Sequence, residues 1–217
     1  MMNSTLPMCY IFGAGDFTPC PITLKTNDHV IAADGGYDHL VQLGLRADVV
    51  LGDFDSVTST DVWADDFIEK ITYPVKKDDT DMMLAVKLGL SRGYKQFSIY
   101  GGLGGRLDHT IGNIQVLSYL AKQGAQGILY HKDQCATVIA SGSFILDKSK
   151  GGTISVFSLS DECTNVCIKG LEYEVKGLTL TNTFPLGISN EATGKKGIIS
   201  LSSGLLLIMW QPYEENS

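Results

Sequence analysis

The sequence contains no apolar run that approaches the ~20 residues needed to cross a bilayer, and no basic region precedes its short apolar segment Met8–Phe12. We therefore expect neither a membrane-spanning helix nor a secretory signal peptide. Basic charge is also scarce, since 17 Lys and Arg stand against 24 Asp and Glu for a formal net charge of −7. Nucleic acids and anionic membranes are usually bound through basic patches, so neither is expected as a partner.

Cysteine pairs of the Cys-x-x-Cys type, which zinc sites use, are missing as well. The cysteines are odd in number, and we expect reduced, mostly buried thiols in a cytoplasmic protein. They are Cys9, Cys20, Cys135, Cys163 and Cys167.

The sequence has no low-complexity linker and no obvious repeat. Its 217 residues, 44% of them hydrophobic, suffice for one sizeable core or two small ones.

The first half of the chain alternates short apolar runs with helical patterns. Strands are predicted over residues 8–12, 30–33, 49–51, 70–74 and 96–100. Apolar residues at helical spacing predict helices over 37–45 and through 114–121, and a third helix that the hexapeptide Lys76–Asp81 opens and Ser91-Arg92-Gly93 ends. This alternation indicates βαβ units, and therefore a mostly parallel sheet with helices on both faces.

The second half is expected to be all β. Strand-like pieces occur at 127–130, 136–140, 143–146, 153–159, 177–181, 197–201 and 205–209. Turn signals separate them and convincing helical patterns are absent, which predicts a small antiparallel β-sandwich. We place the boundary near Gly124, giving an α/β domain over 1–124 and a β-sandwich domain over 125–217.

The most informative stretch is the apolar run Val49–Leu51, which ends in Gly52 and then in Asp53 and Asp55. Two carboxylates this close repel each other and are costly to desolvate, so a cation or a shared proton usually accompanies them. An oxygen-only site suits Mg²⁺. The alternative is a surface turn in which one Asp caps a helix that begins near Ser56.

Other polar segments also follow predicted strands. Asp34 follows the second strand, Asp78 to Asp81 follow the fourth, and the loop Gly101–Asp108 follows the fifth. Ligands of parallel sheets bind outside the carboxyl ends of the strands, so these segments are expected to converge on one edge. Backbone N–H groups of a glycine-rich loop and the guanidinium of Arg106 suit phosphate oxygens. The joint prediction is a metal site beside a phosphate-binding loop.

A set of short motifs, in this order and spacing, resembles the thiamine pyrophosphokinase family in its bacterial form. The motifs are Asp34-Gly35-Gly36, Gly52-Asp53-Phe54-Asp55-Ser56, Lys77-Asp78-Asp79-Thr80-Asp81, Gly104-Gly105-Arg106-Leu107-Asp108-His109 and Ser189-Asn190. The resemblance implies an α/β domain followed by a β-sandwich domain. It also implies a homodimer in which thiamine binds between one subunit's first domain and its partner's second, and transfer of the pyrophosphoryl group of ATP to thiamine, giving thiamine diphosphate and AMP.

The resemblance also implies roles for individual residues. The metal ligands are Asp53, Asp55 and Asp81, with Mg²⁺ as the cofactor. Contacts with ATP fall on Asp34, Gly35, Thr80, Gly104, Gly105 and Arg106. Thiamine contacts fall on Ser189 and Asn190. Asp78 or Asp108 would orient the thiamine hydroxyl or take its proton, while Arg106 would stabilise charge as the bond to AMP breaks.

Two positions depart from the family pattern. Relatives often have an aromatic residue shortly after the Ser-Asn pair, where this chain has Glu191 and Ala192. They also commonly have an acidic residue at the position of Met83.

Two other functions remain as hypotheses. One is a phosphatase with Asp53 as its nucleophile, because an apolar strand followed by Asp-x-Asp also begins aspartyl-phosphate hydrolases. The other is a nucleotide or thiamine sensor without catalysis.

Overall fold

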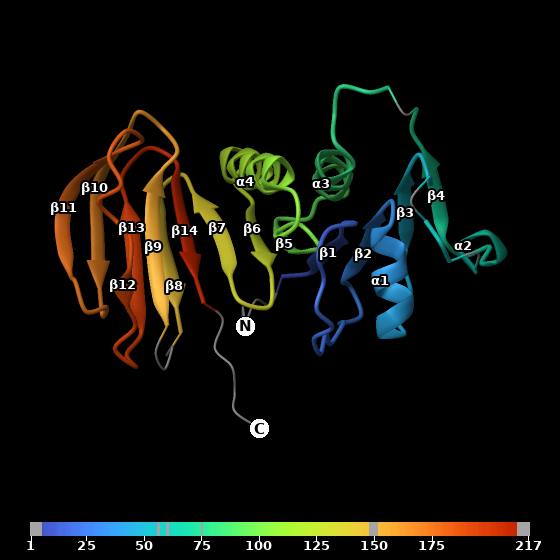
Figure 1. The fold of residues 1–217 in the computed structure, drawn as a ribbon, viewed down its shortest axis with the longest axis horizontal. Helices are drawn as coiled ribbons and strands as arrows, with labels where there is room; N and C mark the ends of the chain where they lie inside the picture. The colour runs from blue at the N-terminus through green and yellow to red at the C-terminus, as the bar shows by residue number, and fades with distance from the viewer. Residues whose placement is uncertain (1–5, 56, 60, 75, 148–151, 212–217) are drawn as a thin grey trace.

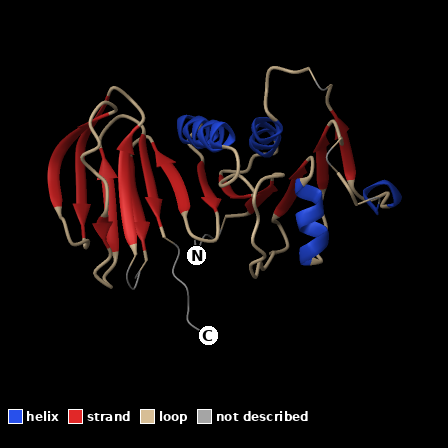
Figure 2. Cartoon of the chain, viewed as in Figure 1, coloured by secondary structure: helices blue, strands red, loops and turns tan. Residues whose placement is uncertain are grey.

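The structure, a computed structural model, describes residues 6–55, 57–59, 61–74, 76–147 and 152–211. Ser56, the last residue of the second motif, lies outside these ranges. Strands alternate with helices in the N-terminal part, and the C-terminal part is built of strands, as Figures 1 and 2 show. The predicted fold class is confirmed.

Five parallel strands form the N-terminal part of the main sheet. They are β1 (Met8–Phe12), β2 (His29–Ala33), β3 (Val49–Gly52), β4 (Glu69–Thr72) and β5 (Gln96–Tyr100). Their order is β5-β1-β2-β3-β4, and every neighbouring pair is parallel. The carboxyl ends of all five strands therefore lie along one edge of the sheet.

Helices cover both faces of this parallel part (Figure 1). They are α1 (Gly36–Leu43), the short α2 (Asp61–Ala64), α3 (Asp81–Ser91) and α4 (Leu107–Lys122). Successive strand side chains point to opposite faces. Ile11 and Ile31 accordingly pack in the core formed with α3 and α4, whereas Phe12 and Val30 pack in the core formed with α1. Burial on both faces explains the continuous apolar runs of these strands.

The main sheet continues past the boundary predicted near Gly124. The strand β6 (Gln126–Tyr130) pairs in parallel with β5 and antiparallel with the next strand, β7 (Cys135–Ile139). The sheet then adds β14 (Leu206–Trp210), β9 (Thr153–Ser158) and the two-residue β12 (Asn190–Glu191). One ten-stranded sheet thus runs through the described chain. The division at Gly124 stays a prediction.

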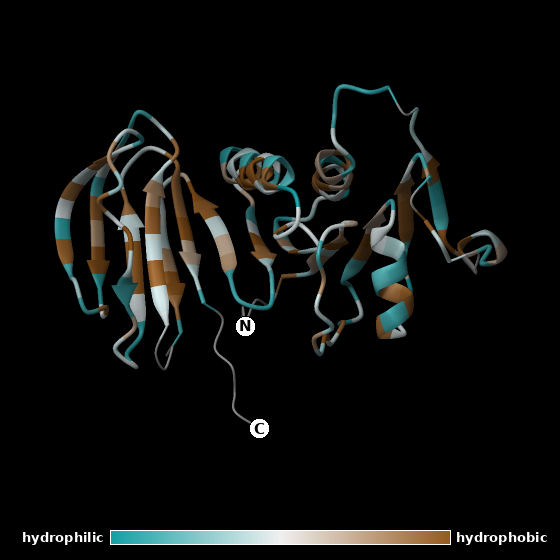
Figure 3. Cartoon of the chain, viewed as in Figure 1, coloured by the Kyte–Doolittle hydropathy of each residue, from teal (hydrophilic) through white to brown (hydrophobic). Residues whose placement is uncertain are grey.

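A second sheet faces the C-terminal end of the first. It contains β11 (Val175–Thr181), β10 (Glu162–Lys169), β13 (Gly197–Leu201) and β8 (Gly142–Leu146), all antiparallel. Apolar side chains of both sheets, such as Ile154 and Ile199, form one core cluster between them. Figure 3 shows the matching alternation of hydrophobic and paler residues along these strands. This is the predicted antiparallel sandwich.

The sequence prediction omitted β10, although it is the longest strand of the sandwich. Its pairing with β11 shifts register twice, between Cys163 and Val166 and again between Val166 and Ile168. Asn165 adopts a left-handed backbone conformation with φ of 53° inside this strand. Such a bulge breaks the alternation of buried and exposed residues by which a strand is identified in sequence.

All five cysteines lie in the described part of the chain and are free thiols, as predicted. Cys9, Cys135 and Cys163 are buried, and the other two are partly buried. In the residues that the structure describes, no helix has the length and apolar character that crossing a membrane requires.

Candidate active site

The carboxyl edge of the parallel strands brings together most of the predicted site residues. Asp34 directly follows β2, Asp53 follows β3, and the loop after β5 carries the predicted phosphate-binding glycines. Asp81 lies at the first position of α3, whose N-terminal turn faces the same edge. The predicted convergence of Asp34, Asp53, Asp55 and Asp81 is therefore observed.

Asp34 connects two of these segments. Its side chain accepts a hydrogen bond from the backbone N–H of Phe54 at 3.3 Å and also hydrogen-bonds the carboxyl group of Asp81. Partial burial, the hydrogen bond with Asp81 and the charge of Asp81 raise the pKa of Asp34 to about 7. Burial is the largest of these causes, and the contributions of Asp81 show that acidic side chains lie close together here, where a cation is favoured.

Asp53 and Asp55 form a second carboxylate pair beside the first. Asp53 Oδ1 accepts a hydrogen bond from the backbone N–H of Asp55 at 3.1 Å. Their hydrogen bond and mutual repulsion raise the pKa of Asp55. The predicted turn at Asp53 and Asp55 is therefore present. In the described residues, however, the next helix, α2, begins at Asp61 rather than near Ser56. Neither carboxylate caps it in the way the capping alternative required.

Asp38 of α1, to which the sequence prediction gave no role, holds the far end of this acidic loop. Its carboxylate accepts hydrogen bonds from the backbone N–H groups of Thr58 at 3.1 Å and Ser59 at 2.9 Å, and from the Thr58 hydroxyl at 2.8 Å. Slight burial would raise the pKa of Asp38, but these hydrogen bonds outweigh it and lower the pKa to about 2. The loop is thus tied down on both sides of Asp55.

The carboxylates fit Mg²⁺ in kind, because oxygen ligands are what this ion prefers. Their hydrogen bonds form two pairs, Asp34 with Asp81 and Asp53 with Asp55, and the charges of each pair also act on the other. The described residues contain no group of three acidic, histidine or cysteine side chains close enough to hold a metal. The ammonium group of Lys77 lies among them and is ion-paired with Asp81. A positive charge is therefore already accommodated at the position where the sequence predicts a metal.

Gly52 is required where β3 meets this site. Its φ of 143° is open almost only to glycine. A Cβ atom at this position would also lie 1.6 Å from Oδ1 of Asp34. The carboxylate of Asp34 thus lies directly against the backbone of Gly52, and the absence of a side chain permits the approach.

We expect Gly52→Ala to lower the free energy of unfolding by about 1–3 kcal/mol, because it adds backbone strain and displaces the Asp34 carboxylate. Gly44→Ala is the matched control, since Gly44 also has a positive φ, of 64°, but a Cβ atom added there would have no other residue's atoms within 4 Å. Urea unfolding of both variants measures the difference. Equal losses in the two variants would mean that the contact with Asp34 contributes nothing.

The predicted phosphate loop packs against the turn that follows β1. Gly15 donates a backbone hydrogen bond to the carbonyl of Gly101 at 3.0 Å, and a Cβ atom on Gly101 would lie 2.1 Å from the carbonyl oxygen of Gly13. The Gly13–Gly15 turn therefore has a packing function. Gly104 and Gly105 remain exposed, so their backbone is accessible to a ligand.

The remaining residues with predicted phosphate roles lie at helix N-termini. Thr80 caps α3, and its Oγ1 accepts a hydrogen bond from the backbone N–H of Met83 at 3.2 Å. Arg106 precedes α4, and its side chain, 72% exposed, forms two hydrogen bonds to Asp108, at 2.6 and 3.2 Å. This pairing lowers the pKa of Asp108. Asp78 is exposed in the loop before α3, and Gly35 is buried before α1.

Ser189 and Asn190 lie far from this edge. They are at β12, the first strand of the ten-stranded sheet, whereas Asp53 follows β3, the ninth. Figure 1 shows the two elements near opposite ends of the molecule. Eight strand spacings of ~4.8 Å place them roughly 40 Å apart along the sheet. One chain therefore does not bring the predicted thiamine contacts to its own predicted metal ligands.

Asn190 is only 8% exposed, and its side chain holds a neighbouring loop. Its Oδ1 accepts the backbone N–H of Tyr173 at 3.0 Å, and its Nδ2 donates to the carbonyl of Tyr173 at 2.8 Å. Ser189 is exposed and has a left-handed φ of 60°. A ligand that approaches this loop would therefore meet Ser189 and Tyr173, which is 64% exposed, before the Asn190 amide.

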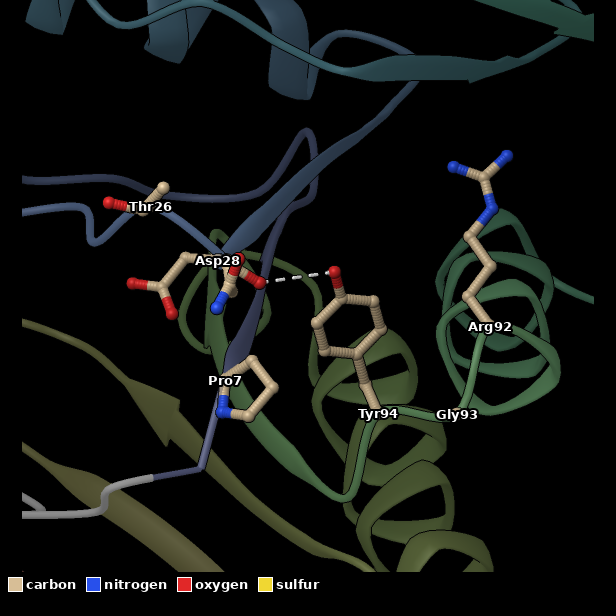
Figure 4. A pocket seen from close by; sticks show the side chains of 7 residues that line it. Pro7, Thr26, Asp28, Arg92, Gly93 and Tyr94 are labelled. Atoms are coloured by element: carbon tan, nitrogen blue, oxygen red, sulfur yellow. Dashed lines mark hydrogen bonds between the residues drawn. The ribbon is translucent and has the colours of Figure 1, made fainter.

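A separate pocket of about 380 Å³ lies at the amino edge of the parallel strands. Figure 4 shows Pro7, Asp28 and Tyr94 around it, with the Tyr94 hydroxyl hydrogen-bonded to a backbone carbonyl. Ligands of parallel sheets bind at the carboxyl edge, and none of the predicted site residues lines this pocket. We therefore assign the site to the carboxyl edge.

Two models of known protein families match the chain. Residues 21–129 match the family model described as the thiamin pyrophosphokinase catalytic domain. The chain belongs to the thiamin pyrophosphokinase family. Residues 143–206 match a second model, the vitamin B1 binding domain of thiamin pyrophosphokinase. The catalytic match contains Asp34, Asp53, Asp55 and Asp81, and the vitamin B1 match contains the Ser189–Asn190 loop.

Individual relatives cover nearly the whole chain. The thiamine pyrophosphokinase of Bacillus subtilis (strain 168) is 29% identical over 196 residues, 87% of this chain and 90% of that protein. A crystal structure of thiamine pyrophosphokinase from B. subtilis has a TM-score of 0.84 at 25% identity, covering 94% of this chain and 98% of the other. The Candida albicans thiamin pyrophosphokinase structure, 15% identical, shares the fold with a TM-score of 0.74 over 95% of this chain and 89% of its own.

Membership in the thiamin pyrophosphokinase family identifies the chain as an enzyme that transfers pyrophosphate to thiamine and forms thiamine diphosphate. Lys77 and Asp38 are the residues at the carboxyl edge whose contacts the sequence prediction did not anticipate. Lys77 belongs to a recognised motif but is its basic residue, whereas the predicted metal ligands are acidic. Asp38 is an acidic residue of a helix and belongs to none of the motifs. The motif connected Lys77 to the site but indicated no role for it, and Asp38 had no sequence signal of this kind.

Proposed function

We propose that the enzyme uses ATP as the pyrophosphate donor with Mg²⁺ as its cofactor, and releases AMP. The observation that carries this proposal is the accumulation of four interacting carboxylates at the same edge of the sheet as a glycine-rich loop. Asp53, Asp55 and Asp81 would hold the metal, after drawing closer together than they lie in the described residues. When bound, Mg²⁺ would neutralise triphosphate charge and polarise the phosphoryl group that is attacked.

The chain's own groups supply the rest of the phosphate binding. Exposed backbone N–H groups of the Gly104–Gly105 turn, the N-terminal turn of α3 and the Thr80 hydroxyl suit phosphate oxygens. The guanidinium of Arg106 is exposed and hydrogen-bonds the carboxylate of Asp108. A phosphate group would compete with Asp108 for it and gain a planar, two-pronged donor.

The reaction requires the thiamine hydroxyl oxygen to bond to the β-phosphorus while the bond from that phosphorus to the bridging oxygen of AMP breaks. Most of the rate enhancement in such transfers comes from positioning and electrostatic stabilisation. The hydroxyl proton passes to a nearby base. Asp108 is the weaker candidate, because its partner Arg106 lowers its pKa, whereas Asp78 is exposed in the loop that leads to Asp81.

We also propose a homodimer with shared active sites. The thiamine loop at β12 and the acidic edge at β3 are eight strands apart in one chain. A two-fold related second chain is the simplest way to bring one subunit's loop to the other's edge. Exposed apolar side chains next to the loop support such a contact. They are Tyr173, Phe184, Leu186 and Ile188.

The free thiols support a cytoplasmic location, which remains a proposal.

The two rival functions, phosphatase and sensor, are less well supported. A phosphatase would use Asp53 as a nucleophile, yet Asp53 belongs to a cluster of carboxylates that also includes Asp34 and Asp81. A sensor without catalysis would not need that cluster to be intact.

The test is to incubate the purified protein with ATP, Mg²⁺ and thiamine and to identify both products. We expect thiamine diphosphate and AMP in equal amounts, because transfer occurs at the β-phosphorus. Omitting thiamine, or chelating the metal, is expected to abolish AMP formation. Thiamine monophosphate and ADP would indicate transfer of the γ-phosphoryl group and would contradict the proposal, and a phosphorylated Asp53 would favour the phosphatase.

A further inference from the structure

Lys77 occupies an unusual position for a lysine. It lies in the loop between β4 and α3, four residues before Asp81, and its side chain is only 14% exposed. The ammonium group is ion-paired with Asp81 and lies 5.7 Å from the centre of the Tyr73 ring. The charges of Asp34 and Asp53 also act on it. Lys77 is thus inside the carboxylate cluster.

A second lysine close by provides the contrast. Lys87 of α3 is ion-paired with Asp79 at 2.6 Å, but its side chain is 43% exposed. The carboxylate charge that acts on its ammonium group is that of Asp79. Exposed pairs of this kind contribute little to stability or binding. The same short segment of chain therefore holds one lysine inside the site and one on the surface.

The ion pair of Lys77 involves a residue that is also proposed to bind the metal. Asp81 is one of the three proposed metal ligands, and its Oδ1 already contacts the ammonium group. Two cations that share one carboxylate repel each other, and the repulsion is strong where water is partly excluded. Metal binding and the Lys77–Asp81 pair therefore oppose each other. Lysine is suited to movement, because its charge lies at the end of a flexible four-carbon stem.

We propose that Lys77 is a further functional residue of the site: it neutralises Asp81 until the metal binds, then leaves Asp81 and donates to a phosphate oxygen of the nucleotide. This inference rests on the proposed function, since it requires Asp81 to be a metal ligand. It accounts for the positive charge that the structure holds among the acids. It also adds a second cation, beside Arg106, for the phosphate chain.

The test uses Mn²⁺ as the probe and the full-length protein without nucleotide. Lys77→Met removes the charge but keeps an unbranched side chain of similar length, and Lys87→Met is the matched control. We expect Lys77→Met to bind Mn²⁺ about fivefold more tightly or better in an electron paramagnetic resonance titration. Lys77→Arg, which keeps the competing charge, and Lys87→Met should match the wild type.

The turnover number, kcat, is the second quantity to measure. Lys77→Met should lower kcat about tenfold or more although its metal site is filled more readily, because the phosphate contact is lost. Lys87→Met should leave kcat unchanged. Circular dichroism establishes that each variant is folded, and Lys77→Gln serves as a second neutral variant if Lys77→Met is not.

The proposal would be overturned if the neutral variants bound Mn²⁺ no more tightly than the wild type, or if they kept full kcat. These results are independent of the product analysis. Thiamine diphosphate and AMP from an enzyme whose neutral Lys77 variants show no gain in Mn²⁺ affinity would retain the proposed function and reject the role of Lys77. Loss of Mn²⁺ binding in Asp53→Asn separately establishes that the titration reports on the proposed site.

Discussion

An Asp53→Asn enzyme is expected to fold normally and to lose pyrophosphoryl transfer by about two to three orders of magnitude. The substitution is conservative in shape. Asn retains the Oδ1 atom that accepts the backbone N–H of Asp55, so the turn after β3 is preserved. What is lost is one negative charge from the cluster that would hold the metal. Steady-state assays of thiamine diphosphate formation measure the effect, and urea unfolding verifies the fold.

Asp81→Asn should show a loss of the same order, because it removes charge from the Asp34–Asp81 pair. Asp79→Asn is the control: Asp79 lies two residues away in the same segment, but it pairs with the exposed Lys87 and has no proposed role in the site. We expect its activity to stay within about twofold of the wild type, as for other surface ion pairs. Near-normal turnover in folded Asp53→Asn or Asp81→Asn protein would reject these residues as metal ligands.

Mixing two inactive chains is expected to restore activity if the sites are shared between subunits. The first chain carries Asp53→Asn at the acidic edge. The second carries Asn190→Ala, which releases the Tyr173 backbone from the thiamine loop because the two hydrogen bonds between the amide and Tyr173 are lost. In a heterodimer, one site would combine both defects and the other would have neither.

Random pairing of equal amounts makes half of the dimers heterodimers, so roughly a quarter of wild-type sites should return. A pull-down with differently tagged chains must first establish that subunits exchange, and unfolding measurements must show that Asn190→Ala remains folded. A mixture of Asp53→Asn with Asp81→Asn is the control, and it should stay inactive, because each heterodimer site would keep one defect of the acidic edge. If exchange occurs without recovery in the test mixture, the Ser189–Asn190 loop serves its own chain or no site.

Local signals in the sequence were sufficient for most of the fold. Strands buried on both faces, such as β1 and β5, have uninterrupted apolar runs, and their observed limits agree with the prediction. The end of α3 was predicted from the Ser91-Arg92-Gly93 stop, and its observed start at Asp81 is the last residue of the hexapeptide that was predicted to open it. The strand β10 was missed, since a bulge at Asn165 breaks its alternation. Its pairing depends on strands distant in sequence, which local pattern does not encode.

The candidate site was predictable in part for a similar reason. Acidic residues that follow several parallel strands must meet at one edge, because parallel strands share a direction, and the structure brings Asp34, Asp53, Asp55 and Asp81 into that arrangement. The contacts of Lys77 and the clamp by Asp38 were not predictable. They depend on where a loop and a helix lie after folding. Lys77 belongs to a motif that does not indicate its partner, and Asp38 belongs to no motif.

By itself the sequence determined the alternating α/β half, the all-β half and the acidic edge, since side-chain periodicity and the direction of parallel strands follow from local chain geometry. Only the tertiary structure decided three further points: that one sheet runs unbroken through both halves, that Lys77 pairs with Asp81, and that the Asn190 amide is occupied by Tyr173. The continuous sheet also separates the thiamine loop from the acidic edge of the same chain. These features arise from contacts between segments far apart in sequence or from the path of a loop, and packing energy selects them only once the whole chain is folded.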